Sequence, residues 1–247
     1  MIEFRNVSHS YGGNAVLDDF SFMADYHERI AVLGGSGEGK TTILRLMLGL
    51  VKPDSGKILI DGQDITGLSE SGLRAFRIKF SIVFQEGALF DSMSVRENVA
   101  FWFREYAYNN EDEIEKRVRK LLARLGIEDA IELMPEELSG GMQRRVAIAR
   151  SLAASSPKML LYDEATSGLD PLTADNICNV IRELSEGDLP DRVGFLLVTH
   201  KVTDASKVAD RFIYLKNGKL TFDGELDELK RTEDPELRKF TEELHAM

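Results

Sequence analysis

Short apolar runs alternate along the chain with segments of helical periodicity. The apolar runs have the length of β-strands, and they lie at 2–7, 29–33, 57–60, 80–84, 159–163, 193–199 and 211–216. Helical patterns cover 40–49, 172–186 and 203–209. Because strands and helices alternate, we expect an α/β fold with parallel strands and crossover helices. Asn217-Gly218 is typical of a hairpin turn and predicts a late antiparallel ribbon into 219–222.

The chain between 87 and 158 departs from this alternation, because it has helical patterns and no convincing strand. Its clearest helix begins after Asn110, a natural N-cap, and ends at Gly126. The apolar positions of this helix form one stripe, which consists of Ile114, Val118, Leu121, Leu122 and Leu125. We therefore expect a helical subdomain at 87–158, inserted between the two parts of an α/β core at 1–86 and 159–224.

The last segment, 225–247, predicts a helical tail. Asp234-Pro235 is typical of a helix start, and Leu237, Phe240 and Leu244 would then share one face. We expect this tail to dock on its own domain, with a contact to a partner as the alternative.

The composition disfavours several classes of protein. In 247 residues the Lys and Arg total is 31 and the Asp and Glu total is 42, a net charge of −11, so we expect no nucleic-acid partner. The single cysteine, Cys178, cannot form an internal disulfide, and its helical position predicts a buried apolar role. No apolar run approaches the ~20 residues of a membrane-spanning helix, and the N-terminus lacks a secretory pattern. We expect a soluble chain that reaches a membrane only through a partner.

A glycine-rich loop lies between the strand at 29–33 and the helix at 40–49. Its sequence, GGSGEGKT at 34–41, matches the phosphate-binding pattern G-x-x-x-x-G-K-[ST]. The backbone N–H groups of such a loop point at an oligophosphate, Lys40 can reach the outer phosphates, and the Thr41 hydroxyl can bind Mg²⁺. The candidate nucleotide-binding residues here are Gly34, Gly35, Ser36, Gly37, Glu38, Gly39, Lys40, Thr41 and Thr42.

Glu38 is unusual in this loop, since a carboxylate adds negative charge to a phosphate cradle. We expect its side chain to point to solvent. If it faced the phosphates instead, Glu38→Ser would tighten nucleotide binding.

Polar residues stand at the ends of three predicted strands. Asp163 and Glu164 close the strand at 159–163, while His200 and Gln85 each follow another strand. Because the carboxyl ends of parallel strands open onto the ligand crevice, these residues would lie near the phosphate loop. One acid could hold Mg²⁺ and the next could deprotonate an attacking water. We also expect a chemical role for His200, and Gln85 could contact Mg²⁺ or water.

A second potential anion site stands at Ser139, Gly140 and Gly141, which begin another helix. An ordinary serine cap is the simpler interpretation. Two anion sites in one chain are hard to join to a single triphosphate, which suggests that one copy of the chain completes the site of another. Arg144-Arg145 fit the polar side of this helix.

In their order along the chain, these segments resemble the motifs of the ABC-type ATPase family. The likeness covers nearly the whole chain and rests on 34–41, Gln85, 138–143, Asp163-Glu164, 167–170 and His200. It implies the ABC ATPase fold, which is a RecA-like parallel-sheet core with an antiparallel β ribbon region and an inserted α-helical subdomain. Met142, Ala165 and Lys201 replace the family's commoner glutamine, proline and aspartate, but none of them is a phosphate, Mg²⁺ or base residue.

The resemblance also implies roles for the residues. Glu164 would be the general base, His200 the γ-phosphate sensor, and Tyr11 the aromatic that stacks on adenine. Two copies would enclose two ATP·Mg²⁺, each gripped by the loop of one copy and by Ser139-Gly140-Gly141 of the other. Thr41, Gln85 and Asp163 would surround Mg²⁺, Gln85 would link the site to the partner, and Asp170 would lie in the loop that spans the dimer.

Three further segments, at 84–99, 133–135 and 234–240, are similar to the Mla/Mce-type lipid transporter ATPases. That likeness implies phospholipid transport, a membrane permease dimer, a lipid-binding Mce partner, and a place at the cytoplasmic face of the inner membrane. We expect 87–98, with Leu89 and Phe90, to touch the permease. The alternatives are a soluble ABC ATPase of the cell-division or Fe–S assembly type, an ABC transporter ATPase for another substrate, and a P-loop kinase.

Overall fold

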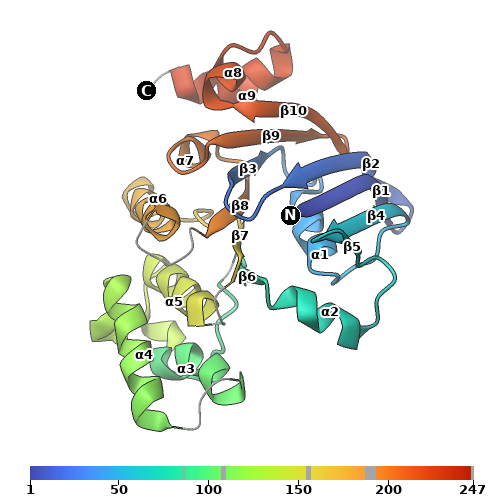
Figure 1. Cartoon of the computed structure of the whole chain (residues 1–247). Coiled ribbons are helices and arrows are strands. Elements are labelled where there is room, and N and C mark those ends of the chain that lie inside the picture. Colours follow the sequence, from blue (N-terminus) through green and yellow to red (C-terminus); the bar gives the residue numbers. More distant parts are fainter. Residues whose placement is uncertain (86, 107–109, 154–156, 187–192, 246–247) are drawn as a thin grey trace.

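The computed structural model describes residues 1–245 except for 86, 107–109, 154–156 and 187–192 (Figure 1). Its main sheet has six strands in the order β10-β9-β3-β8-β7-β6. These strands are β3 (Arg29–Leu33), β6 (Phe80–Val83), β7 (Met159–Asp163), β8 (Gly194–Thr199), β9 (Arg211–Lys216) and β10 (Lys219–Glu225). All neighbouring pairs are parallel except β9 and β10, which form the hairpin expected at Asn217-Gly218. The structure confirms the predicted α/β fold.

A second, antiparallel sheet lies beside the main one (Figure 1). It consists of β1 (Ile2–Tyr11), β2 (Asn14–Ala24), β4 (Ser55–Ile60) and the short β5 (Gln63–Asp64). The predicted strands at 2–7 and 57–60 lie in this antiparallel sheet and not in the parallel one, and β2 was not predicted at all. The pattern of β2 is hard to recognise because Asp19 has a left-handed φ of 53° and interrupts the alternation between Leu17 and Phe20.

The described part of 87–158, where the sequence predicts an inserted helical subdomain, contains three α-helices. These are α3 (Val95–Tyr106), α4 (Glu111–Arg124) and α5 (Gly140–Ala153), with short 3₁₀ turns at Glu128–Ala130 and Pro135–Glu137. Within the described part of 87–158, no residue lies in a strand. The Asn110 side chain accepts hydrogen bonds from the N–H groups of Asp112 and Glu113, which is the predicted cap. The predicted stripe faces inward, with Ile114, Val118 and Leu122 fully buried.

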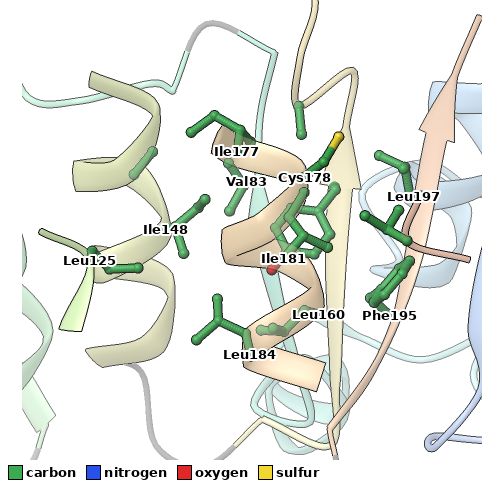
Figure 2. Close-up of a cluster of buried hydrophobic side chains, with 14 of the residues drawn as sticks. Val83, Leu125, Ile148, Leu160, Ile177, Cys178, Ile181, Leu184, Phe195 and Leu197 are labelled. Atoms are coloured by element: carbon green, nitrogen blue, oxygen red, sulfur yellow. The ribbon is translucent and has the colours of Figure 1, made fainter. Parts of the chain in front are cut away.

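The remaining helices pack near the two sheets. They are α1 (Lys40–Met47), α2 (Glu70–Arg77), α6 (Pro171–Glu186) and α7 (Val202–Ser206). In Figure 2, Ile181 and Leu184 on α6 lie between Ile148 on α5 and Phe195 on β8, and all four residues belong to one buried cluster. Cys178 belongs to the same buried cluster, and burial raises the pKa of its thiol to about 12. Its predicted apolar role is confirmed.

The tail packs on its own chain, as expected. It consists of α8 (Leu226–Lys230) and α9 (Pro235–His245). Leu237 and Leu244 are buried, and the ring of Phe240 lies 5.2 Å from that of Tyr214 on β9. Asp234 caps α9 by accepting a hydrogen bond from the Leu237 N–H. None of the helices in the described residues combines the length and the hydrophobicity that a membrane span requires.

Candidate active site

The phosphate loop connects the end of β3 to the start of α1, in the middle of the main sheet. Its backbone is packed so closely that side chains would not fit at two positions. A Cβ on Gly34 would lie 2.6 Å from the Leu215 carbonyl oxygen, and one on Gly39 would lie 2.8 Å from that of Val16. Gly39 also has a φ of 98°, which favours glycine. The glycines are therefore required by the way in which the loop fits against its neighbours.

Lys40 lies at the base of this loop with 7% of its surface exposed. Its Nζ donates hydrogen bonds to the carbonyl oxygens of Gly34 and Gly35, at 3.0 and 2.8 Å. Burial lowers the pKa of Lys40, while the carboxylates of Glu164 and Asp163 oppose this shift. A buried ammonium group at the base of a glycine-rich loop is suited to receive an oligophosphate.

Thr41 and Asp163 join the loop to the end of β7. The Thr41 hydroxyl donates a hydrogen bond of 2.9 Å to Asp163 Oδ1. Burial raises the pKa of Asp163, and the hydrogen bond from Thr41 partly offsets this effect. The two residues are 122 positions apart in the sequence, and the parallel arrangement of β3 and β7 in one sheet brings them together.

Glu164 is the first residue beyond β7, and it has a left-handed φ of 50°. Its N–H donates to the Val198 carbonyl oxygen of the neighbouring β8. Its carboxylate lies 3.0 Å from His200 Nδ1, accepts a 3.1 Å hydrogen bond from the Thr199 hydroxyl, and lies 3.7 Å from Lys40 Nζ. A strained backbone conformation held by such contacts is common at functional sites.

The structure thus brings together Lys40, Thr41, Asp163, Glu164 and His200, all candidates from the sequence. Thr199 is an additional member that sequence reasoning missed. Its position as the last residue of a strand whose next residue is His200 was the available signal.

Gln85 and Tyr11 lie near strand ends, and in the part of the chain that the structure describes neither forms a hydrogen bond or an ion pair with this cluster. Gln85 is exposed beyond β6, and Tyr11 is 40% exposed at the end of β1, edge-on to His9 at 4.6 Å. The segment that carries Gln85 is held by α5, since Arg144 donates to the Phe84 carbonyl oxygen and Arg150 to those of Gly87 and Ala88. Arg144 is buried, so its expected place on the polar side of α5 was wrong.

Ser139 caps α5 by accepting a hydrogen bond from the Met142 N–H. Gly141 fits closely against the start of α6, because a Cβ on it would lie 2.5 Å from Thr173 Cγ2, and one on Gly140 would lie 3.3 Å from Leu169 Cδ2. Among the described residues, no hydrogen bond or ion pair connects Ser139 with the phosphate loop of the same chain. The candidate second anion site and the phosphate loop are therefore separate features of one chain.

Glu38 does not point to solvent, which corrects the expectation from the sequence. It is half-buried, and its Oε2 accepts a hydrogen bond from the backbone N–H of Asn217 in the β9–β10 turn. The reason is that the turn brings an N–H donor to the loop, a contact across 179 residues that local sequence patterns do not reveal.

The oxygen atoms of Thr41 and Asp163 fit a magnesium ion. Mg²⁺ prefers hard oxygen ligands and is commonly bound by one or two protein groups together with substrate phosphates and water. In the described part of the chain, no group of three or more His, Cys, Asp or Glu side chains could hold a metal. An ion here would therefore complete its coordination with phosphate and water.

The fold and this cluster define a P-loop ATPase of the α/β class. Residues 17–167 match the family model described as ABC transporter. The chain is 39% identical over 97% of its length to the protein TRIGALACTOSYLDIACYLGLYCEROL 3 of Arabidopsis thaliana chloroplasts, and covers 73% of that protein. It is 36% identical over 97% of its length to the intermembrane phospholipid transport system ATP-binding protein MlaF of Escherichia coli, covering 88% of it.

Other relatives serve different transport systems. The methionine import ATP-binding protein MetN 1 of Rhodococcus jostii is 41% identical over 96% of this chain, which covers 70% of that protein. The dimeric ATP-binding cassette MJ0796, solved in a post-hydrolysis state with ADP and Pi, superposes with a TM-score of 0.81. It is 31% identical, and the match covers 92% of this chain and 99% of that one. This chain belongs to the ABC transporter family, as an ATP-binding subunit that is an ATPase.

Proposed function

We propose that the chain powers phospholipid transport through a partner permease, closing as a homodimer on ATP and reopening after hydrolysis. The observation that carries the ATPase part is the cluster of Lys40, Thr41, Asp163, Glu164 and His200 at the mouth of the phosphate loop. We assign a function to each segment of the chain. The core at 1–86 and 159–224 binds nucleotide, the helical subdomain at 87–158 contacts partners, and 225–247 forms the tail.

Within this site, Lys40 binds the outer phosphates and Glu164 accepts a proton from the attacking water. As the water oxygen bonds to the γ-phosphorus, the bond to the β-phosphate oxygen breaks and ADP leaves. His200 orients the Glu164 carboxylate through its Nδ1 contact, and Tyr11 stacks on the adenine. When bound, Mg²⁺ would supply positive charge that offsets the charge developing on the phosphates. Thr41, Asp163 and Gln85 are the residues proposed to hold it.

The separation of the phosphate loop from Ser139 within one chain supports the proposed dimer. Ser139, Gly140 and Gly141 of one copy would bind the phosphates held by the loop of the other copy. Leu172 supports this proposal, since it is 73% exposed at the start of α6, two residues beyond Asp170 in the loop expected to span the dimer. Burial of this side chain in an interface would remove apolar surface from water, which is favourable.

The proposed permease contact lies at 87–98, next to Gln85. There Phe90 is 39% exposed, its ring lies 4.9 Å from that of Phe101, and the Arg150 guanidinium lies 5.2 Å from its centroid. Arg150 also holds the backbone of Gly87 and Ala88, so movement of this surface and movement of α5 are linked. Such a link would transmit dimer closure to the membrane partner.

The phospholipid cargo is supported by the similarity to the phospholipid transport subunit MlaF over 97% of this chain. The partners would then be Mla/Mce-type permease subunits and a lipid-binding Mce protein, and the chain would lie at the cytoplasmic face of the inner membrane. A second candidate is import of a small metabolite, favoured by the 41% identity to the methionine import subunit MetN 1.

The two cargoes are separated by isolating the complex that the chain forms with its permease. We expect mass spectrometry of that complex to find an Mce-type subunit and bound phospholipid, and reconstituted vesicles to move phospholipid upon ATP addition. A complex that instead moves methionine and leaves phospholipid in place would refute the lipid proposal.

A further inference from the structure

Glu38 has a structural partner outside the phosphate loop. Its Oε2 accepts a hydrogen bond from the Asn217 N–H, so the carboxylate turns toward the β9–β10 hairpin. Glu38 stands between Gly37 and Gly39, which have left-handed φ values of 85° and 98°. Glycines permit many backbone conformations. The side chain of Glu38 is therefore well placed to restrict the most adaptable part of the loop.

The hairpin turn is itself firmly anchored. Asn217 and Gly218 have φ values of 48° and 73°, as a two-residue turn of this kind requires. The Gly218 carbonyl oxygen accepts a hydrogen bond from the Asp18 N–H on β2 at 3.0 Å, and Lys219 forms an ion pair with Asp18 at 3.0 Å. The strand pairing between Lys216 and Lys219 does not use the Asn217 N–H, which is the group that Glu38 binds.

The same neighbours contact both ends of the loop. Gly34 lies against the Leu215 carbonyl on β9, and Gly39 lies against the Val16 carbonyl on β2. Glu38 adds a hydrogen bond between these two backbone contacts. The loop is thus supported on its outer side by β9, the turn and β2, while Lys40 occupies its inner side.

We propose that Glu38 is a positioning residue that latches the phosphate loop to the β9–β10 turn and so prearranges it for the nucleotide phosphates. The proposal rests on phosphate binding at this loop. Without the latch, residues 36–39 sample conformations that do not bind phosphate. Ordering these residues then makes the binding free energy of the nucleotide less favourable. Because Lys40, Asp163 and Glu164 remain in place, the chemical step on bound ATP is unaffected.

The latch and the alternative, a carboxylate that faces the phosphates, predict opposite changes in nucleotide affinity when Glu38 is replaced. Removing a like charge would tighten nucleotide binding, whereas removing the latch weakens it. For Glu38→Ala we expect the Kd for ADP with Mg²⁺ and the KM for ATP to rise about five- to tenfold, which corresponds to the usual net worth of one solvent-accessible hydrogen bond. The kcat should stay within about twofold of the original. Glu38→Gln should show a smaller rise, because its amide oxygen can still accept the N–H without the charge.

The test is calorimetric titration of the full chain with ADP and Mg²⁺, together with steady-state ATPase assays. Asn217→Gly is the matched control, because it keeps both the N–H donor and the left-handed turn, and its Kd should equal that of the original chain. Circular dichroism melts without nucleotide verify that each variant is folded.

Three results would overturn the latch: a Kd for Glu38→Ala that falls, a Kd that stays unchanged, or a Kd for Asn217→Gly that rises as much as for Glu38→Ala. Lys40→Ala tests the underlying site separately. If Lys40→Ala bound ADP as tightly as the original chain, the phosphate site itself would be misassigned, whatever the Glu38 variants showed.

Discussion

Asp163→Asn should make the protein more stable and less active. Asp163 is 6% exposed, and burial is the largest influence on its pKa, which is raised. The folded protein therefore holds this carboxylate as an anion at a cost that the unfolded chain does not bear. Asparagine removes the charge and keeps an oxygen that can accept the hydrogen bond from Thr41.

The expected gain in the free energy of unfolding at pH 7 is about 1–2 kcal/mol, typical of relieving a buried polar or charged cost at a functional site. For a chain of this size, 1 kcal/mol corresponds to about 2–4 °C in Tm. The direction in which this gain changes with pH follows from the number of protons that the folded and unfolded states bind. An acid with a raised folded-state pKa binds more protons when folded than when unfolded, so it lowers stability as pH rises through its folded-state pKa. The gain from Asp163→Asn should therefore shrink as pH falls below that value.

Differential scanning calorimetry without nucleotide measures the gain, and Asp129→Asn at an exposed position of the 3₁₀ turn is the matched control. The ATPase rate and the extra stabilisation by Mg²⁺ with ATP should both fall sharply in Asp163→Asn. A Tm that drops relative to the original chain, or one that rises equally in Asp129→Asn, would refute the reasoning.

Three further expectations follow from other parts of the molecule. Ile181→Ala should lower the free energy of unfolding by about 2–5 kcal/mol in denaturant titrations, because Ile181 is fully buried between α5 and the main sheet; a loss below about 1 kcal/mol would contradict this packing. Leu172→Glu should abolish ATP-dependent dimerisation in light-scattering measurements while leaving the Tm of the single chain within about 2 °C, since Leu172 is exposed; dimers that form as before would remove Leu172 from the interface. Arg150→Ala should reduce stimulation of the ATPase by the reconstituted permease more than the basal rate, because Arg150 holds Gly87 and Ala88; an equal loss in both rates would argue against the proposed contact.

The sequence predicted the features that depend on local chemistry. The phosphate loop was recognisable because its glycines, lysine and threonine stand at fixed spacing between a strand and a helix. Asp163, Glu164 and His200 were recognisable because parallel strands present polar residues at one edge of a sheet. The structure places these residues within hydrogen-bond or ion-pair distance of one another.

Features that depend on partners far away in the chain could not be predicted from the sequence. Glu38 was assigned to solvent because its partner, the Asn217 N–H, is a backbone group far along the chain. Arg144 was assigned to a polar helix face because its acceptor is the Phe84 carbonyl oxygen, which is also a backbone group. The strand β2 was missed because the left-handed Asp19 breaks its alternation, and a charged pair, Asp18-Asp19, stands in its middle.

Loss of Glu164, the proposed general base, should separate nucleotide binding from hydrolysis. In Glu164→Gln we expect turnover to fall by about 10²–10⁴-fold, the usual contribution of a general base. ATP should still bind and dimerise the protein, because Lys40 and the loop are unchanged. A variant with full ATPase activity in a phosphate-release assay would exclude Glu164 as the base.

In the proposed dimer, each nucleotide is bound by the phosphate loop of one copy and by Ser139 of another. This arrangement is tested most directly by mixing two variants, one carrying Ser139→Cys and the other Ser36→Cys, both with Cys178→Ala and Glu164→Gln. Because each chain then has a single thiol, a short bis-maleimide can join the two sites only between copies. We expect cross-linked heterodimers with ATP and Mg²⁺ and none without nucleotide. Equal cross-linking with and without ATP, or none in either case while ATP is bound, would contradict the account.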